Sequence, residues 1–179
     1  MNKIYITGCA KSGTTLLRRL MNAFNITVYN EGEMSLEDFT VSNYQCAKRT
    51  HKTIFSNALN ATEIKEQVDI IEKNNISIIY IWRDFKDVIK SDSGYVSLKR
   101  WQHSVIQSLD YNELIAIDIH YTKLIENPDD IQQHIAHKIG LKVLHKWSEF
   151  PDWYTIEEPE HLTTNKMYRL RRIGESKSN

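Results

Sequence analysis

The sequence has no excess of charge of one sign. Lys and Arg together contribute 23 residues and Asp and Glu contribute 23, so the formal net charge is +0 at pH 7. A balanced chain has no global basic field, and we therefore expect binding neither to nucleic acid nor to an anionic membrane surface. Any site for an anion must be local.

Cysteine is also scarce, and there is no long apolar run. Cys9 and Cys46 do not form a CxxC pair, which gives neither a disulfide framework nor a zinc signature. Met1 leads directly into a short β-favouring run, without the apolar core of a signal peptide, and no segment approaches the length of a membrane span. We expect a soluble, reduced, cytoplasmic protein.

What the chain does contain is the composition of one globular domain. It has 179 residues, of which 41% are hydrophobic and 26% charged. We expect a single domain over residues 1–179, in which the aromatic, then acidic and then basic segment 151–179 is an irregular C-terminal tail.

Strand-like and helix-like patterns alternate along the first 140 residues. Apolar, β-favouring runs predict strands at 3–7, 26–29, 44–48, 76–82 and 114–119. Apolar residues at helical spacing predict helices at 14–24, 60–74, 84–91, 98–109 and 127–140. This alternation predicts an α/β fold with a doubly wound, mostly parallel central sheet and flanking helices.

The segment 8–15, Gly-Cys-Ala-Lys-Ser-Gly-Thr-Thr, joins the first predicted strand to the first predicted helix. Open parallel sheets bind ligands beyond the carboxyl ends of their strands, where the start of a helix offers N–H groups to an anion. Gly8 and Gly13 allow the backbone to approach a ligand closely, and Thr14 and Thr15 can add hydroxyl donors. The segment is therefore predicted to cradle a phosphate.

The glycine spacing of this loop matches the Walker A motif, but Thr14 occupies the position of the Walker lysine. Nucleoside triphosphatases use that lysine on the transferred phosphates, so its absence weakens an ATPase or kinase interpretation. The run 10–16, Ala-Lys-Ser-Gly-Thr-Thr-Leu, resembles instead the phosphosulfate loop of sulfotransferases that use 3′-phosphoadenosine-5′-phosphosulfate (PAPS). The resemblance implies that the donor is bound by Lys11, Ser12, Gly13, Thr14 and Thr15.

A second segment, residues 79–91, Ile-Tyr-Ile-Trp-Arg-Asp-Phe-Lys-Asp-Val-Ile-Lys-Ser, also resembles this family. Sulfotransferases hold the 3′-phosphate of the donor with an arginine after a central strand and a serine eight residues later, and Arg83 and Ser91 match these positions. A guanidinium at a strand end and a hydroxyl about two helical turns further can face one phosphate. The usual proline is Phe85 here. Taken alone, Arg83 would be interpreted as the partner of a surface carboxylate such as Asp87.

Two further segments extend the resemblance. Residues 120–128, His-Tyr-Thr-Lys-Leu-Ile-Glu-Asn-Pro, resemble the tyrosine-led segment of the family, which implies that Tyr121 lies near adenine; a core tyrosine with a solvated hydroxyl is the alternative. Arg171 and Arg172 are candidates for a shortened basic loop that contacts the 3′-phosphate, and a flexible charged terminus is the alternative. The resemblance covers about residues 3–140 and implies a compact, PAPS-dependent sulfotransferase with a P-loop-like fold.

Sulfuryl transfer requires a base for the acceptor and compensation for charge on the departing phosphate. Residues 48–51, Lys-Arg-Thr-His, resemble the Lys-Thr-His segment that supplies the histidine base of the family, so His51 is the first candidate, with a solvated loop histidine as the alternative. Other branches use a glutamate, so Glu31 and Glu33 are rivals. The resemblance assigns to Lys11 the charge that develops on the bridging oxygen.

The resemblance further implies PAPS as the donor, adenosine 3′,5′-bisphosphate as the product, and a small-molecule, carbohydrate or peptide acceptor, without a metal. His134 and His137 share a helix face, but their spacing without further ligands is a weak metal signature. One rival function is a P-loop kinase or other nucleotide phosphotransferase, since the apolar run 114–118 ends in an acid as Walker B strands do. Another is a noncatalytic nucleotide-binding module.

Overall fold

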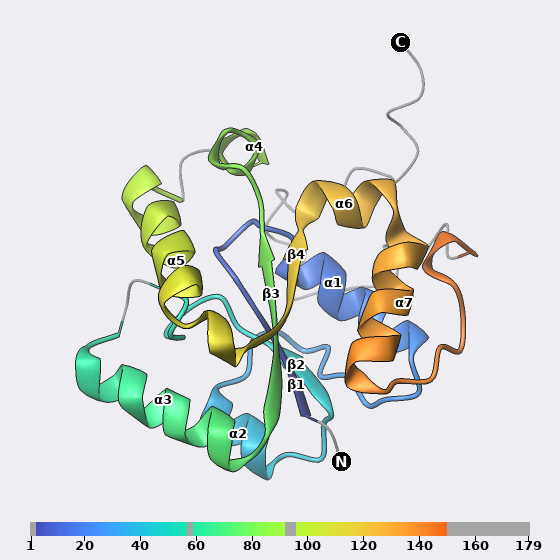
Figure 1. The fold of residues 1–179 in the computed structure, drawn as a ribbon, viewed down its shortest axis with the longest axis horizontal. Coiled ribbons are helices and arrows are strands. Elements are labelled where there is room, and N and C mark those ends of the chain that lie inside the picture. Colours follow the sequence, from blue (N-terminus) through green and yellow to red (C-terminus); the bar gives the residue numbers. More distant parts are fainter. Residues whose placement is uncertain (1–2, 57–58, 92–95, 150–179) are drawn as a thin grey trace.

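The centre of the fold is a parallel β-sheet. The computed structural model describes residues 3–56, 59–91 and 96–149. Within them, four parallel strands pair in the order β2-β1-β3-β4 (Figure 1). Their bounds are Lys3–Thr7 for β1, Cys46–Lys48 for β2, Ile76–Trp82 for β3 and Ile115–His120 for β4. The predicted parallel sheet is confirmed.

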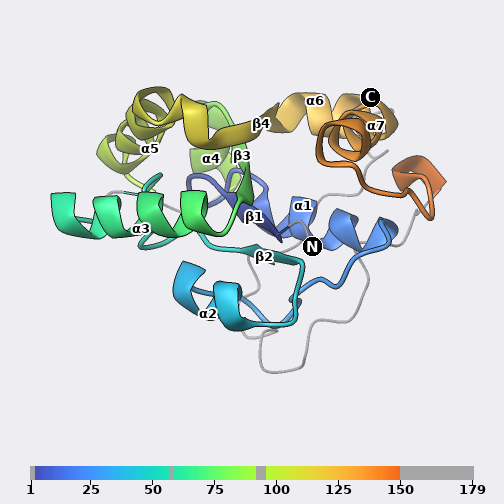
Figure 2. The same cartoon turned by 60° about the horizontal axis from the view of Figure 1, so that its bottom comes forward.

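Helices cover both faces of this sheet (Figures 1 and 2). In Figure 1, α1, α6 and α7 lie on one side of the strands and α2, α3 and α5 on the other. The helices are α1 (Thr14–Leu20), α2 (Leu36–Val41), α3 (Ala61–Lys73), α4 (Phe85–Ser91), α5 (Leu98–Asp110), α6 (Tyr121–Glu126) and α7 (Pro128–Ile139). Three 3-10 turns are η1 (Met21–Ala23), η2 (Asn112–Leu114) and η3 (Trp147–Glu149). This arrangement is the predicted α/β architecture. No helix in the described ranges is long and apolar enough to cross a membrane.

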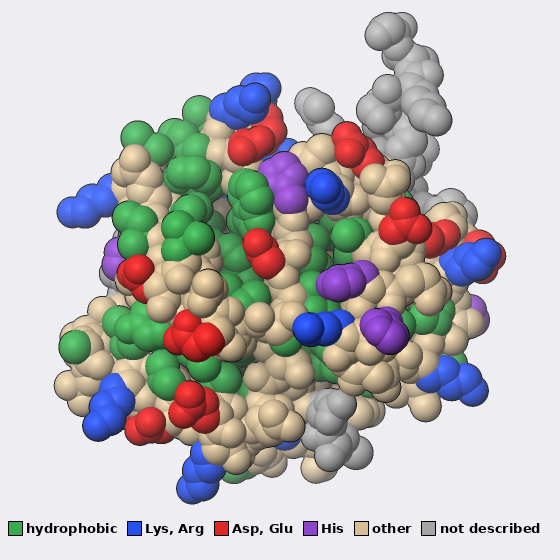
Figure 3. Space-filling model, viewed as in Figure 1, with side chains coloured by type: hydrophobic (Ala, Val, Ile, Leu, Met, Phe, Trp, Pro, Cys, Tyr) green, Lys and Arg blue, Asp and Glu red, His purple; other side chains and the backbone are tan. Residues whose placement is uncertain are grey.

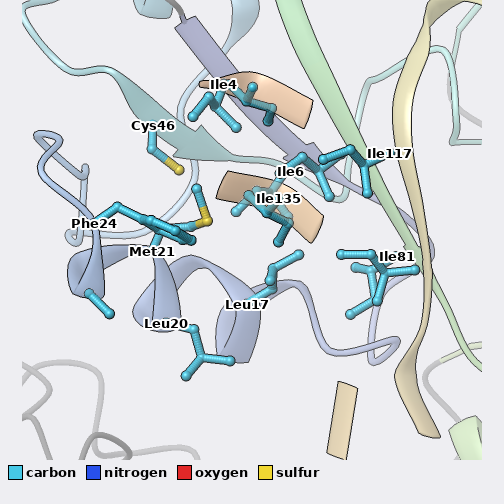
Figure 4. Packing of buried hydrophobic residues seen from close by; sticks show 14 of the residues in the cluster. Ile4, Ile6, Leu17, Leu20, Met21, Phe24, Cys46, Ile81, Ile117 and Ile135 are labelled. Carbon is cyan, nitrogen blue, oxygen red and sulfur yellow. The ribbon is translucent and has the colours of Figure 1, made fainter. Parts of the chain in front are cut away.

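Successive residues of each strand enter opposite layers, because side chains alternate across a sheet. Ile4 and Ile6 of β1 belong to the core beneath α1 and α7, where Leu17 and Met21 pack around them (Figure 4). Tyr5 belongs to the core on the other face. Burial on both faces explains why β3 is almost continuously apolar. On the face of the molecule drawn in Figure 3, basic (blue) and acidic (red) side chains are interspersed.

The predicted strand at 26–29 is wrong. The segment lies beside β2 but forms only an isolated bridge, between Val28 and Cys46. The amide of Tyr29 donates to the carbonyl of Cys46 at 2.8 Å, and the amide of Met34 donates to that of Lys48 at 3.1 Å. Residues 30–33 loop out between these two hydrogen bonds. The segment therefore follows β2 to its carboxyl end without becoming a strand.

The helix boundaries follow recognisable capping chemistry. Asn60 and Glu63 form a reciprocal capping box at the start of α3, and Gly140 ends α7 with a left-handed φ of 76°. The first predicted helix ends at Leu20 and continues only as the turn η1. Helix α2 lies where no element is predicted, and its side chains in the core are Leu36 and Phe39. Two apolar residues are too few to establish a helical period.

Candidate functional site

Four of the predicted site segments that the structure describes follow the carboxyl ends of strands. Since the four strands are parallel, these ends meet at one edge of the sheet. The loop 8–13 follows β1, His51 follows β2, Arg83 follows β3 and Tyr121 follows β4. The topology therefore gathers the candidate residues at the place where open α/β sheets bind ligands.

The loop after β1 packs closely against β3 and α6, and this packing requires both of its glycines. Gly8 has a φ of 151°, and a Cβ there would lie 2.1 Å from the carbonyl oxygen of Ile81 in β3. Gly13 has a φ of 106°, and a Cβ there would lie 2.4 Å from Cδ2 of Tyr121. Side chains would therefore push the loop away from β3 and α6.

Ser12 closes this loop from the inside. Its side chain is fully buried, and its hydroxyl lies 2.6 Å from the carbonyl oxygen of Cys9 and 2.8 Å from that of Ile81. Its amide also donates to the Cys9 carbonyl, at 3.1 Å. Both donors of Ser12 are thus used within the protein. The structure gives Ser12 a role in shaping the loop, and its contact with a donor phosphate stays a prediction.

Lys11 lies at the turn of the loop in an unusual backbone conformation. Its φ is 69°, in the left-handed region that a non-glycine residue adopts at a cost of about 1 kcal/mol or more. Thr14, the first residue of α1, is buried, and Thr15 is partly exposed. Gly13 provides no side-chain cap for α1. The loop is therefore held in one shape with its lysine at the turn.

Arg83, Tyr121 and Gly13 lie in a continuous stack. The guanidinium carbon of Arg83 is 4.3 Å from the centroid of the Tyr121 ring, and the same ring occupies the space beside Gly13. The indole of Trp101 donates to the carbonyl of Arg83 at 2.8 Å. Asp87 forms an ion pair with Lys90 at 3.5 Å. Among the described residues no ion pair joins Asp87 to Arg83. Three segments that are distant in the sequence thus form one wall beside the loop.

The environment of Tyr121 keeps its phenol neutral. Burial raises the pKa of Tyr121, and the nearby charge of Arg83 offsets part of that increase. Ser91 is the last residue of α4, and its side chain lies outside what the structure describes. Arg171 and Arg172 also lie outside the described residues. The predicted contacts of these three residues with a 3′-phosphate stay predictions.

Glu33 lies at the carboxyl end of β2, carried there by the loop 30–33. Its Oε1 accepts hydrogen bonds from Nζ of Lys48 at 3.2 Å, from the amide of Thr50 at 3.1 Å and from the hydroxyl of Thr50 at 2.6 Å. Burial raises the pKa of Glu33, but the Lys48 charge and the Thr50 hydroxyl outweigh it and lower the pKa below its ordinary value. The side chain is therefore a carboxylate at neutral pH. Glu31, in the same loop, is exposed.

His51 also lies at this end of β2, where its ring contacts a cation. Its Nδ1 lies 2.5 Å from Nη2 of Arg100, in the first turn of α5. Burial lowers the pKa of His51; Glu33 opposes this shift, and Arg100 adds to it. The imidazole is therefore neutral at physiological pH. Glu33 and His51 influence each other electrostatically, so the structure brings two of the three candidate bases together.

Two residues that hold this part of the site carry no sequence signal. Gln67 of α3 is buried, accepts from the amide of Ile54 at 3.1 Å and donates to the carbonyl of Lys52 at 2.8 Å. It thereby fixes the turn that follows His51. Arg100 belongs to a helix whose sequence gives no indication of a site. Both contacts depend on how α3 and α5 pack, which a local motif does not encode.

The pairing of Glu33 with Lys48 leads to a stability prediction. We expect Glu33→Gln to lower the free energy of unfolding at pH 7 by about 2 kcal/mol, because it leaves the buried Lys48 ammonium without a counter-charge. The folded-state pKa of Glu33 lies below its ordinary value of 4.5, so its contribution is present above about pH 4.5 and is lost as the pH falls through the folded-state pKa. Urea denaturation of both proteins at several pH values measures this.

The difference between wild type and Glu33→Gln should therefore shrink towards acidic pH. Glu31→Gln is the matched control, since it removes an exposed carboxylate from the same loop, and we expect a change within about 0.5 kcal/mol. A difference for Glu33→Gln that stays constant down to strongly acidic pH would contradict the charge pairing.

The described residues thus combine a parallel sheet, helices on both faces and a glycine-containing loop between β1 and α1, which define a P-loop-like α/β fold. This fold is similar to that of mouse sulfotransferase SULT7A1 complexed with PAP, with a TM-score of 0.54 and 15% sequence identity. The match covers 86% of this chain and 63% of that chain, so this chain spans less than two thirds of the mouse protein's structure. No protein-family model and no curated protein matches the sequence. At this identity the likeness concerns the fold.

Proposed function

We propose that the protein is a PAPS-dependent sulfotransferase that moves a sulfuryl group to a hydroxyl or amine and releases adenosine 3′,5′-bisphosphate (PAP). The observation that supports this most strongly is the stack of Arg83 on Tyr121 beside Gly13 of the loop. A nucleotide with phosphates at both its 5′ and 3′ positions needs two separate anion sites around one nucleoside. The loop and Arg83 are suited to be those two sites.

The loop residues would bind the 5′-phosphosulfate and Arg83 the 3′-phosphate, with Ser91, Arg171 and Arg172 as further proposed contacts. Tyr121, between the two anion sites, would lie near the adenine. The mouse sulfotransferase of similar fold was crystallised with PAP, which agrees with this choice of nucleotide. The acceptor is a small molecule, carbohydrate or peptide in the proposal.

Transfer requires that the acceptor oxygen attack sulfur in line with the bond to the phosphate. As the new O–S bond forms, the acceptor loses its proton and the electrons of the broken S–O bond go to the phosphate oxygen of PAP. Lys11 would neutralise the charge on that oxygen. Cationic side chains and amides supply the positive potential, and the proposal includes no metal.

Of the three candidate bases, Glu33 fits the role of proton acceptor best. It is ionised, and its three hydrogen bonds all involve Oε1. Among the described residues Oε2 has no hydrogen-bond donor, so it can face an acceptor hydroxyl. Glu31 shares none of these contacts. His51 is neutral, but its Nδ1 is already hydrogen-bonded to Arg100.

The position of Asp118 in β4 does not favour the kinase alternative. A Walker B acid acts from the carboxyl end of its strand. Asp118 lies two residues before the end of β4 and is exposed. Its neighbours Ile117 and Ile119 enter the core under α1, so Asp118 points to the opposite face of the sheet.

The test is a product assay. The purified chain is incubated with PAPS and a panel of alcohols, phenols, sugars, amines and tyrosine peptides in EDTA, and PAP is measured; a parallel reaction contains ATP and Mg²⁺. We expect acceptor-dependent release of PAP and no turnover of ATP. Magnesium-dependent turnover of ATP would favour the kinase. Binding of PAPS without release of PAP for any acceptor would favour the noncatalytic module.

A further inference from the structure

We propose that Arg100 is a positioning residue that holds His51 as its Nε2–H tautomer, so that His51 donates a hydrogen bond to the reacting group and leaves proton removal to Glu33. The inference rests on the proposed sulfotransferase function and deepens it. It assigns separate duties to two side chains that the sequence offers only as rivals for one duty.

The contact between the Arg100 guanidinium and the His51 imidazole determines the tautomer of the imidazole. Nη2 of Arg100 lies 2.5 Å from Nδ1 of His51, which is a short hydrogen-bond contact. A guanidinium has five N–H donors and no acceptor, so Nδ1 must accept with its lone pair. A neutral imidazole carries one ring proton, which is therefore on Nε2. In this state Nε2 can donate a hydrogen bond but cannot accept a proton.

The surrounding charges act in the same direction. Protonation of His51 would place an N–H on Nδ1 directly against the guanidinium of Arg100. Lys48 and Arg49 also disfavour a charged ring, and Glu33 is the group that favours one. Burial is the largest cause that lowers the pKa of His51, the three cations add to it, and together they outweigh Glu33. His51 therefore stays neutral, with Nε2 protonated.

Both partners are fixed by separate elements, which is what a positioning role requires. Helix α5 starts at the Ser97 cap, whose hydroxyl accepts from the Arg100 amide at 3.2 Å. The next residue, Trp101, is hydrogen-bonded to the carbonyl of Arg83 at the end of β3. On the other side, Gln67 fixes the turn after His51. Arg100 thus links the histidine to the same part of α5 that supports Arg83.

In the proposed step each proton and each electron pair has a defined acceptor. Oε2 of Glu33 takes the proton of the acceptor hydroxyl, the acceptor oxygen forms its bond to sulfur, and PAP leaves with the electron pair of the broken S–O bond. His51 donates from Nε2 to a sulfuryl oxygen and exchanges no proton. Arg100 touches none of the reacting atoms in this scheme.

Substitutions at His51 separate the two possible roles. A glutamine side chain can donate a hydrogen bond from a position close to Nε2, but it cannot act as a base. We expect His51→Gln to keep kcat/KM for PAPS-dependent transfer within about tenfold of wild type and His51→Ala to lower it about 10²-fold. Equal losses of 10³-fold or more in both variants would show that His51 is the base and overturn the proposal.

Arg100 is tested by the pH profile. Arg100→Met removes the donor and a nearby cation, so the ring can change tautomer and its pKa rises; we expect the acidic limb of kcat/KM to lie at higher pH than in wild type. Arg100→Lys, which can still donate to Nδ1, should restore the wild-type profile. Lys99→Met removes a neighbouring exposed cation and is the matched control. A purely structural role would lower the rate of Arg100→Met without moving its pH dependence.

The tautomer of His51 can be measured independently of sulfuryl transfer. Nitrogen-15 NMR of the imidazole ring identifies which nitrogen is protonated, and we expect the Nε2–H form in wild type and a mixture in Arg100→Met. An Nδ1–H ring in wild type would overturn the role of Arg100 even if the enzyme transfers sulfuryl groups. An Nε2–H ring in a protein that releases no PAP would instead refute the proposed function alone.

Discussion

Gly8→Ala is expected to abolish binding of PAP and to lower the free energy of unfolding by about 3 kcal/mol or more. The new Cβ would lie 2.1 Å from the backbone carbonyl of Ile81, and φ at this position is 151°. Neither strand backbone can move without disturbing the pairing of β1 with β3. Urea denaturation and titration with PAP measure the two effects.

Gly140→Ala is the matched control for this prediction. Gly140 also has a positive φ, of 76°, but a Cβ there meets nothing within 4 Å. Only the backbone cost remains, about 1 kcal/mol, and PAP binding should be unchanged. If Gly8→Ala is as stable as Gly140→Ala and binds PAP, the close packing of the loop against β3 is not required.

Lys11→Ala is expected to lower kcat for sulfuryl transfer by about 10²–10³-fold. In the proposed mechanism Lys11 opposes the charge that develops on the departing phosphate oxygen, so its loss would destabilise the transition state more than the bound donor. We therefore expect a smaller change in the affinity for PAP than in kcat. Steady-state kinetics with PAPS and direct titration with PAP separate these quantities.

Lys52→Ala is the control for the effect of replacing a lysine that has a left-handed backbone conformation. Lys52 has a left-handed φ of 49°, similar to the 69° of Lys11, and lies in the turn after His51. Alanine keeps the same backbone strain at both positions, so the stability effects should match. Equal losses of kcat in the two variants would contradict a specific charge role for Lys11.

The fold was predictable where local patterns are strong. β3 reads as a continuous apolar strand, and α3 and α7 have helical periods with clear caps. The segment 26–29 has the composition of a strand. Whether it becomes one depends on how it lies against its neighbour, and it forms only a single bridge to β2. Composition therefore predicted the apolar character of this segment and not its structure.

The candidate site was predictable in part. The loop at 8–15, Arg83 and Tyr121 were proposed as candidates from motifs, because each follows a strand with a recognisable residue pattern. Their mutual contact required the order β2-β1-β3-β4 and the close packing of Tyr121 on Gly13. The contact of Arg100 with His51 joins α5 to the end of β2, and no local sequence pattern encodes it. The sequence thus proposed candidate residues, and the packing defined which side chains contact them.

The central claim is that this site selects a 3′-phosphorylated adenine nucleotide, and comparative ligand binding tests it most directly. Thermal stabilisation and calorimetric affinity are measured for PAP, ADP and AMP on wild type, on Arg83→Ala and on Lys86→Ala, an exposed cation on α4 that serves as the control. We predict that wild type and Lys86→Ala prefer PAP and that Arg83→Ala weakens PAP binding about 10- to 100-fold, with little effect on AMP. Equal stabilisation of wild type by all three ligands would contradict the account.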